Sequence, residues 1–259
     1  MKNLLKIIFA LFLIISCEPL NSPGEPEYNY SILFNLIANK KNQEIFIYKV
    51  VTGDEQLSYK LEKYFVKNAQ ILIGNKNWNY KHFSLIRENT YFNQSKGFHY
   101  RNIDSLELLP NSNYNLEVNI NGNIIKGTTT TPEDFEIISP KNGSILTYKG
   151  RKSQNKKIKI IWNKSGSAKG YIIKTFYSYS IEFNDSLYNI SSVNSYITKD
   201  TTLSFNTLLQ GKGILKLEVQ AFDKNYYNHI IEKIPSVGIK GAYGYFGSSI
   251  LKTSTILIK

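Results

Sequence analysis

The sequence has very few of the residues that cross-link a protein or bind a metal. Of its 259 residues one is a cysteine, Cys17, and three are histidines. A single thiol cannot form a disulfide within the chain, so the folded part must depend on its hydrophobic core. The histidines, His82, His99 and His229, are far apart and show none of the short spacings typical of metal ligands. We therefore predict no disulfide, no metal site and no cofactor.

The linear motifs of common catalytic sites are also missing. The sequence contains no Gly-x-Ser-x-Gly elbow and no phosphate-binding P-loop. Its carboxylates are scattered, and only Glu218 with Asp223 could be compared with the acid pair of a glycosidase. We expect these two side chains to be solvated and predict no catalytic residue and no enzymatic activity. An envelope hydrolase is the alternative, and it would need clustered carboxylates or a histidine in a pocket.

Arginine is scarce although the chain is basic. The formal net charge is +12, yet only Arg87, Arg101 and Arg151 contribute arginine side chains. Proteins that read nucleic acids depend on the forked guanidinium group for base contacts. We therefore predict no nucleic-acid partner and attribute the excess of lysine to compositional bias. The basic loop between Lys149 and Lys159 is the segment that would have to bind a polyanion if this prediction were wrong.

Only one uninterrupted apolar run stands out, and it lies at the N-terminus. Ile7 to Ile15 spans nine residues, whereas a helix needs about 20 to cross a bilayer. Lys2 and Lys6 precede the run, and Ser16 places a small residue directly before Cys17. This order is typical of a bacterial lipoprotein signal. It predicts that residues 1–16 are a signal peptide and that Cys17 carries the lipid, including palmitate.

Residues 17–27 are predicted to form a tether behind the lipidated cysteine. The stretch EPLNSPGEPE contains three prolines and one glycine, which keep it extended and prevent a helix. Glu18 follows the cysteine where an inner-membrane retention signal would have aspartate. We therefore expect a lipid anchor in the outer membrane, with the protein either periplasmic or surface-exposed.

The remaining chain is predicted to be all-β, in two tandem immunoglobulin-like sandwiches of antiparallel strands at residues 28–132 and 133–259. Alternating apolar and polar residues indicate half-buried strands at Tyr30–Leu36 and Glu44–Val51. Helical spacing between Leu57 and Phe65 allows one or two helical turns there.

The clearest local pattern lies between residues 106 and 132. Asn121-Gly122 stands between two alternating segments, which predicts a tight hairpin with a type I′ turn. Leu108, Pro110 and Tyr114 precede it at the spacing of the tyrosine corner. This pattern resembles fibronectin type III and related immunoglobulin-like domains, in which the tyrosine hydroxyl bonds to upstream backbone.

The second domain has a similar order of signals. Trp162 lies in an alternating segment, and Tyr171 follows nine residues later. The pair resembles the tryptophan of strand B and the tyrosine of strand C in a fibronectin type III domain. Residues 203–205 suit a strand E, residues 213–222 form the most regular predicted strand in this half, and residues 181–197 suit hairpin strands and loops.

The C-terminal segment contains two motifs in sequence. Ala221, Asp223, Tyr226 and Tyr227 match the pattern Ala-x-Asp-x-x-Tyr-Tyr. A Gly-x-Gly-x-Phe-Gly closure follows, matched by Gly244, Phe246 and Gly247, although Ala242 replaces one expected glycine. The pair of motifs resembles a family of bacterial outer-membrane lipoproteins of unknown function, whose members are often encoded beside TonB-dependent receptors and have no assigned catalytic residues. The resemblance implies an accessory of an outer-membrane receptor or transporter.

Aromatic clusters with polar neighbours provide the only candidate ligand site outside the anchor. Exposed aromatic rings stack on sugars and anchor protein interfaces. We predict as candidate ligand-binding residues Trp78, Tyr80, Tyr226 and Tyr227. The first functional prediction is a lipid-anchored binding and scaffolding protein of the cell envelope, and the alternative is a surface glycan-binding module. The glycan prediction requires these rings to be exposed.

Overall fold

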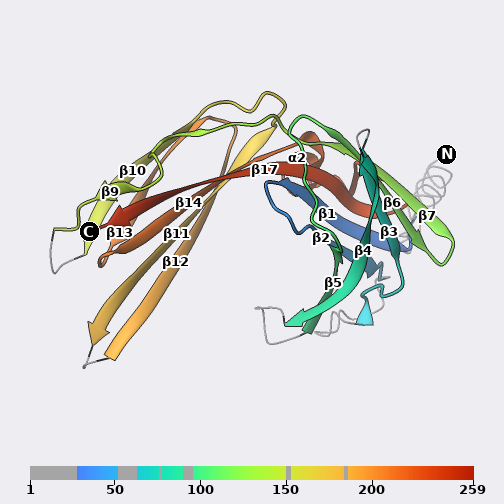
Figure 1. The fold of residues 1–259 in the computed structure, drawn as a ribbon, viewed down its shortest axis with the longest axis horizontal. Helices are drawn as coiled ribbons and strands as arrows, with labels where there is room; N and C mark the ends of the chain where they lie inside the picture. The colour runs from blue at the N-terminus through green and yellow to red at the C-terminus, as the bar shows by residue number, and fades with distance from the viewer. Residues whose placement is uncertain (1–27, 52–62, 76–77, 90–95, 150–152, 184–185) are drawn as a thin grey trace, which may run out of the picture.

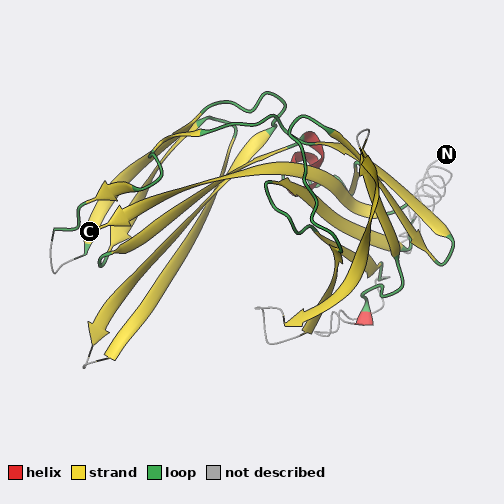
Figure 2. Cartoon of the chain, in the orientation of Figure 1, coloured by secondary structure: helices red, strands yellow, loops and turns green. Residues whose placement is uncertain are grey.

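The computed structural model describes residues 28–51, 63–75, 78–89, 96–149, 153–183 and 186–259. The predicted signal peptide, Cys17, the tether and most of the possible helical segment lie outside the described residues. Within them the chain is nearly all strand, with one short helix (Figures 1 and 2), so the predicted all-β class is confirmed. No helix among these residues is long and apolar enough to cross a membrane.

The first half of the chain forms a sandwich whose two sides share strand β4. One side has the order β1-β2-β5 and the other has the order β4-β3-β6-β7. The early part of β4 pairs with β3 and its later part pairs with β5, so β4 connects the two sides. The strands are β1 (Tyr30–Ala38), β2 (Glu44–Lys49), β3 (Gln70–Asn75), β4 (Trp78–Asn89), β5 (Lys96–Asn102), β6 (Asn113–Ile120) and β7 (Asn123–Thr130).

The second half places a four-stranded layer against a three-stranded one. The first layer has the order β12-β11-β14-β17, and the second has the order β13-β10-β8. The short strand β9 pairs with the end of β17. The strands are β8 (Ile137–Ser139), β9 (Ser144–Leu146), β10 (Gln154–Trp162), β11 (Gly170–Phe183), β12 (Ser186–Thr198), β13 (Thr202–Leu209), β14 (Gly213–Phe222) and β17 (Tyr243–Ile258).

Strand β17 belongs to both halves of the chain. Its first part pairs with β1 and its last part pairs with β14, as the long red strand in Figure 1 shows. Ile250 is fully buried at the crossover, opposite Ala38 of β1 and Ala221 of β14. Two short strands, β15 (Ser236–Val237) and β16 (Ile239–Lys240), also return to the first half, where β16 pairs with β7. The boundary at residue 132 therefore does not separate the sheets.

The sheets are mainly antiparallel, and strand β17 adds parallel pairs to them. β17 pairs in parallel with β1, β9 and β15, whereas its ladder with β14 is antiparallel. Parallel neighbours need a long connection, and here nearly the whole chain separates β1 from β17. Sequence alternation identifies a strand but does not specify such a distant partner.

The predicted turn and tyrosine corner are both present. Asn121 and Gly122 have positive φ angles of 52° and 87°, as a type I′ hairpin turn requires. The Tyr114 hydroxyl accepts a hydrogen bond of 2.8 Å from the backbone N–H of Leu109. The second half repeats this arrangement, because the Tyr171 hydroxyl accepts from Ser165 N–H at 2.9 Å. Each tyrosine therefore holds the loop that precedes its strand against the sheet.

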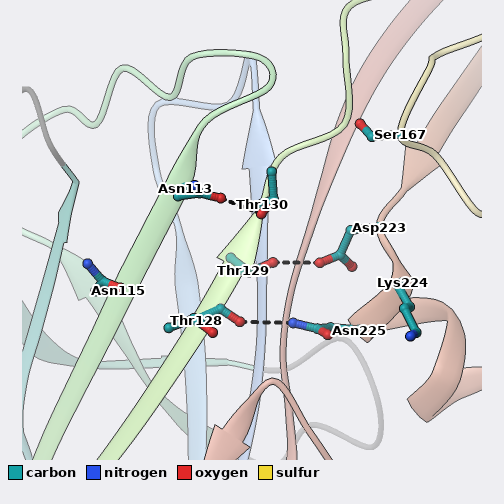
Figure 3. Close-up of a pocket in the computed structure, with 9 residues that line it drawn as sticks. All are labelled: Asn113, Asn115, Thr128, Thr129, Thr130, Ser167, Asp223, Lys224 and Asn225. Atoms are coloured by element: carbon teal, nitrogen blue, oxygen red, sulfur yellow. Dashed lines mark hydrogen bonds between the residues drawn. The ribbon is translucent and has the colours of Figure 1, made fainter.

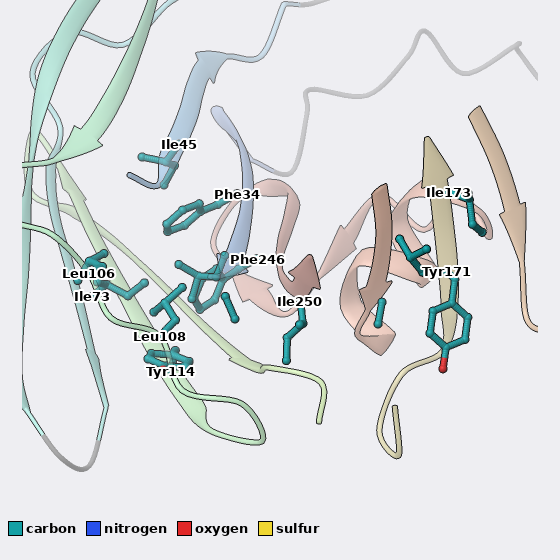
Figure 4. Packing of buried hydrophobic residues seen from close by; sticks show 14 of the residues in the cluster. Phe34, Ile45, Ile73, Leu106, Leu108, Tyr114, Tyr171, Ile173, Phe246 and Ile250 are labelled. Carbon is teal, nitrogen blue, oxygen red and sulfur yellow. The ribbon is translucent and has the colours of Figure 1, made fainter. Parts of the chain in front are cut away.

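A single hydrophobic cluster extends through both halves (Figure 4). In the first half Phe34 stacks on Phe246, with ring centroids 5.3 Å apart. In the second half the Trp162 and Tyr171 rings meet edge to face at 5.3 Å. Since Phe246 comes from β17, the C-terminal closure is part of the core of the first half.

Candidate functional site at the junction of the two halves

The one described α-helix lies where the two halves meet. Helix α2 (Lys224–Ile230) follows β14 directly, and Asp223 is its N-cap residue. The Asp223 Oδ1 atom accepts a hydrogen bond of 2.8 Å from the Tyr226 N–H. Capping of this kind satisfies a backbone donor that has no partner within the helix. The Asp-x-x-Tyr part of the family motif thus has a local structural role.

Asp223 also joins the second half to the first. The Thr129 hydroxyl of β7 donates to Asp223 Oδ2 at 2.5 Å, and it lies 3.1 Å from the Ser248 hydroxyl of β17. Ser248 in turn donates to the Thr130 carbonyl at 2.8 Å. All three side chains that meet here are buried. The network therefore fixes β7, β14 and β17 against one another.

Burial raises the pKa of the Asp223 carboxyl above its ordinary value. The physical cause is desolvation, which disfavours the charged form. Hydrogen bonds from Thr129 and from the Tyr226 N–H offset part of this rise. Asp223 is thus a buried acid with its own partners, and the expectation that it is solvated is wrong.

A polar groove of about 600 Å³ opens beside this network (Figure 3). The described residues of its lining carry amide, hydroxyl, carboxyl and ammonium groups, and none of these residues is aromatic. Asn225 crosses one end, and its Nδ2 atom donates to the carbonyls of Thr128 and Phe246, each at 2.9 Å. The lining residues are Asn113, Asn115, Thr128, Thr129, Thr130, Ser167, Asp223, Lys224 and Asn225.

The glycines of the C-terminal closure allow close backbone approach at this junction. A Cβ atom at Gly247 would lie 2.8 Å from the Tyr226 backbone nitrogen of α2. Gly244 has a φ of 98° and lies against the backbone of Ile32 in β1. The two segments in which the sequence resemblance was seen therefore meet in space, and both have structural reasons for their residue types.

The two candidate tyrosines on α2 do not form an open aromatic platform. The Tyr227 ring stacks on Phe222 at 6.0 Å, and the Lys199 ammonium lies 4.9 Å from the same ring. The Tyr226 ring packs against Phe222 and meets Tyr245 edge to face at 5.4 Å. Burial raises the pKa of both Tyr226 and Tyr245. These rings contribute to packing around the helix.

The structure does not bring the four candidate aromatic residues into a described common site. Trp78 and Tyr80 lie in β4, and their side chains are outside the described residues. β4 pairs with β3 and β5, whereas α2 contacts β15 and β17. Cys17 also lies outside the described residues, so its predicted lipidation stays a prediction.

The remaining polar candidates have separate environments. Glu218 pairs with Lys216 at 2.7 Å, whereas Asp223 bonds to Thr129, so the two carboxylates serve different contacts. His99 lies 3.2 Å from an Arg101 nitrogen, and His229 Nδ1 lies 2.9 Å from the Ile234 carbonyl. In the described part of the chain, no group of three or more potential metal-binding side chains is found.

Thr129, Ser248 and Asn225 were not identified from the sequence. Thr129 belongs to the run TTTT, in which alternation buries Thr129 and Thr131 and exposes their neighbours. Ser248 and Ser249 lie between Phe246 and Ile250 in strand β17, and both are fully buried. A pair of small hydroxyl residues inside a strand is the signal that points to a buried polar contact.

The sequence matches no family model and no curated protein. Among solved structures, the chain is similar to CBD12 from CALX1.2, with 11% identity, a TM-score of 0.25, and coverage of 88% of this chain and 99% of that one. It is also similar to Dpr2 Ig1-Ig2 in complex with DIP-Theta, with 11% identity, a TM-score of 0.23, and coverage of 88% and 66%. A DUF4785 family protein from Legionella pneumophila has 11% identity, a TM-score of 0.20, and coverage of 73% and 51%. TM-scores this low do not support a fold assignment, so the fold of this chain is assigned from its own strand pairing.

Proposed function

We propose that this protein is a lipid-anchored binding and scaffolding protein of the cell envelope, accessory to an outer-membrane receptor or transporter. The observation that carries the proposal is strand β17, which is continuous through both halves. A body joined in this way keeps its surfaces in a fixed relation, which suits the presentation of binding surfaces to a larger partner. The signal-like residues before Cys17 and the proline-rich tether support anchoring at the membrane.

Replacing Cys17 with serine tests the anchor on which this proposal depends. Serine keeps the size of the side chain but has no thiol to acylate, so the Cys17→Ser protein should lose palmitate labelling and leave the membrane fraction. The measurement is metabolic labelling with a palmitate analogue, followed by fractionation. Ser16→Ala is the matched control, because it keeps a small residue before the cysteine. A Cys17→Ser chain that stayed acylated in the membrane would contradict the proposal.

Crosslinking of the wild-type chain in native membranes then tests the accessory role. A receptor or transporter of the outer membrane should be recovered with the protein after mild crosslinking. Recovery of no envelope protein would count against the accessory role while leaving the anchor intact.

The polar groove favours a second candidate, glycan binding, at a place different from the predicted aromatic residues. Its amides and hydroxyls can both donate and accept hydrogen bonds, as recognition of sugar hydroxyls requires. Asn113, Asn115 and Thr130 have exposed side chains at its edge. The groove is the feature that supports this candidate, because the Tyr226 and Tyr227 rings are engaged in packing.

An Asn115→Ala exchange tests the groove. If a glycan binds there, the affinity for an oligosaccharide found on an array should fall about tenfold, as the loss of one good hydrogen bond predicts. Titration calorimetry with that oligosaccharide measures the change. Asn206→Ala is the control, because Asn206 is exposed on β13 and outside the groove. Equal affinity of both variants, or no glycan bound at all, would exclude this candidate.

A further inference from the structure

One end of the first half holds the described residues that follow the proposed lipid anchor most closely in the chain. Tyr28 meets Tyr243 of β17 edge to face, with ring centroids 5.2 Å apart. The register places Ser31 of β1 beside Tyr243, and Tyr30 opposite Lys49 of β2. Strands β1 and β17 therefore start at the same end, at the right of Figure 1, and β17 runs from there into the second half.

Two further segments reach this end of the molecule. The loop after α2 does so because the Gly244 N–H donates to the Pro235 carbonyl at 2.7 Å. The tip of the β6–β7 hairpin lies beside the same loop, since a Cβ atom at Gly241 would be 3.7 Å from the Ile124 carbonyl. These parts form one surface, which we call the tether-side surface: the starts of β1 and β17, the end of β2, residues 121–126 and residues 231–242.

The tether-side surface carries exposed apolar side chains next to tyrosines. Ile124 is 57% exposed and Ile234 is 41% exposed. Tyr28, Tyr30 and Tyr243 are half-buried beside them. A tyrosine ring has an apolar body and a polar tip, and such rings are enriched where a membrane meets water. The combination therefore suits the boundary between headgroups and acyl chains.

Lysines surround these apolar side chains. The exposed ones are Lys49, Lys126, Lys233 and Lys240. Two carboxylates offset part of this charge, because Glu117 lies 3.8 Å from Lys126 and Glu232 precedes Lys233 in the chain. The six side chains together keep a positive charge, which anionic phospholipid headgroups attract.

The number of residues before Tyr28 limits how the molecule can stand on a membrane. Residues 17–27 are eleven in number, and a chain of that length reaches at most about 40 Å. Strand β17 has 16 residues and is therefore about 50 Å long. If the far end of the second half stood on the membrane, Tyr28 would lie beyond the reach of a lipid at Cys17. The end that bears Tyr28 is thus the one held near the bilayer.

We propose that the tether-side surface docks on the membrane that holds the lipid anchor. Ile124 and Ile234 enter the headgroup boundary, and the lysines contact headgroup phosphates. This inference rests on the proposed acylation of Cys17 and adds an orientation to it. The first half faces the bilayer, β17 leads away from it, and the second half is presented to a partner at a distance from the lipid.

A fluorophore at position 124 measures the docking directly. In the acylated full-length protein, Ile124→Cys provides one free thiol for an environment-sensitive dye, because Cys17 carries the lipid. The protein is reconstituted into vesicles of phosphatidylcholine and phosphatidylglycerol. The emission should shift to the blue, and a lipid with a nitroxide just below its headgroup should quench about half of it, since interfacial side chains enter roughly 5–10 Å.

Ile214→Cys with the same dye is the matched control. Ile214 is 49% exposed, similar to Ile124, but it lies opposite Leu257 near the far end of β17. It should be quenched little. Equal quenching at both positions, or none at position 124 in protein that floats with the vesicles, would overturn the docking while leaving the anchor intact. A chain that carried no acyl group and did not float would contradict the anchor, and with it the docking.

Exchanging two lysines tests the part played by the headgroup phosphates. Lys126→Gln with Lys240→Gln should reduce quenching at position 124 about threefold, as should neutral phosphatidylcholine vesicles or high salt, because each weakens the attraction between lysine and phosphate. Lys157→Gln with Lys159→Gln is the control, since both side chains are exposed on β10 in the second half. Equal effects of the two double variants would show that only net charge matters and would refute this surface as the docking site.

Discussion

Replacing Gly244 with alanine should lower the free energy of unfolding by about 3–5 kcal/mol, which is exceptional for one methyl group. Two causes add. The φ of 98° at this residue is unfavourable for any side chain. In addition, a Cβ atom there would overlap the Ile32 carbonyl, whose carbon would be only 2.9 Å away. Because the Ile32 carbonyl belongs to the backbone of β1 and the backbone of β17 fixes the position of the Cβ atom, no side-chain rotation relieves the overlap.

Gly122→Ala is the matched control for this prediction. Gly122 has a similar φ of 87°, but a Cβ atom there would have no atom within 4 Å. Its cost should be only the backbone strain, about 1–2 kcal/mol. Urea unfolding of both variants measures the two costs. Equal losses would mean that close approach of β17 to β1 does not matter.

This comparison illustrates what the sequence can predict. The Asn121-Gly122 turn and the Tyr114 corner depend on residues only a few positions apart, and both were predicted correctly. The strand at Gly213–Phe222 was also recognised, because alternation in a single strand reflects burial of one face. Local patterns therefore sufficed for the fold class and for most strands.

The sharing of β17 between the halves was not predictable in this way. Only the end of β17 alternates in burial like a half-buried strand, and nothing local indicates that Phe246 packs with Phe34 while Ile256 pairs with Leu215. Residues 244–250 are buried on both faces of the strand. A strand that is buried on both faces has apolar or small residues throughout, which is the one sign of this arrangement in the sequence.

The candidate site was the least predictable part. Asp223 was noted as half of an acid pair with Glu218, but its hydrogen-bond partners are different residues. Thr129 lies 94 positions before Asp223 in the sequence, and Ser248 lies 25 positions after it. A threonine in a strand has no pattern that indicates a buried carboxylate across the sheet. The family resemblance did single out Asp223. In the structure this residue caps helix α2 and joins the second half to the first through Thr129.

The second large effect should come from removing the Asp223 carboxyl. Asp223→Ala deletes the cap of α2 and the acceptor for the Thr129 hydroxyl, leaving buried donors without their partner. We expect a loss of about 2–4 kcal/mol, the sum of a helix cap and an unsatisfied buried hydroxyl. Asp200→Asn, at an exposed position, should change stability by less than about 0.5 kcal/mol.

Asp223→Asn should separate the charge of this residue from its role as an acceptor. Burial raises the pKa of the carboxyl in the folded protein above its ordinary value of 3.8, so folding favours the protonated form. Its stabilising contribution is therefore complete below that value and is lost as the pH rises through the raised pKa.

Asparagine keeps an oxygen for the Tyr226 N–H but does not titrate. The wild-type protein should thus be most stable relative to Asp223→Asn in acid, and this advantage should shrink towards neutral pH. Urea unfolding from pH 3 to pH 8 measures the difference, and an advantage that grew with pH would show that the carboxylate, rather than the acid, is what the junction between the two halves stabilises.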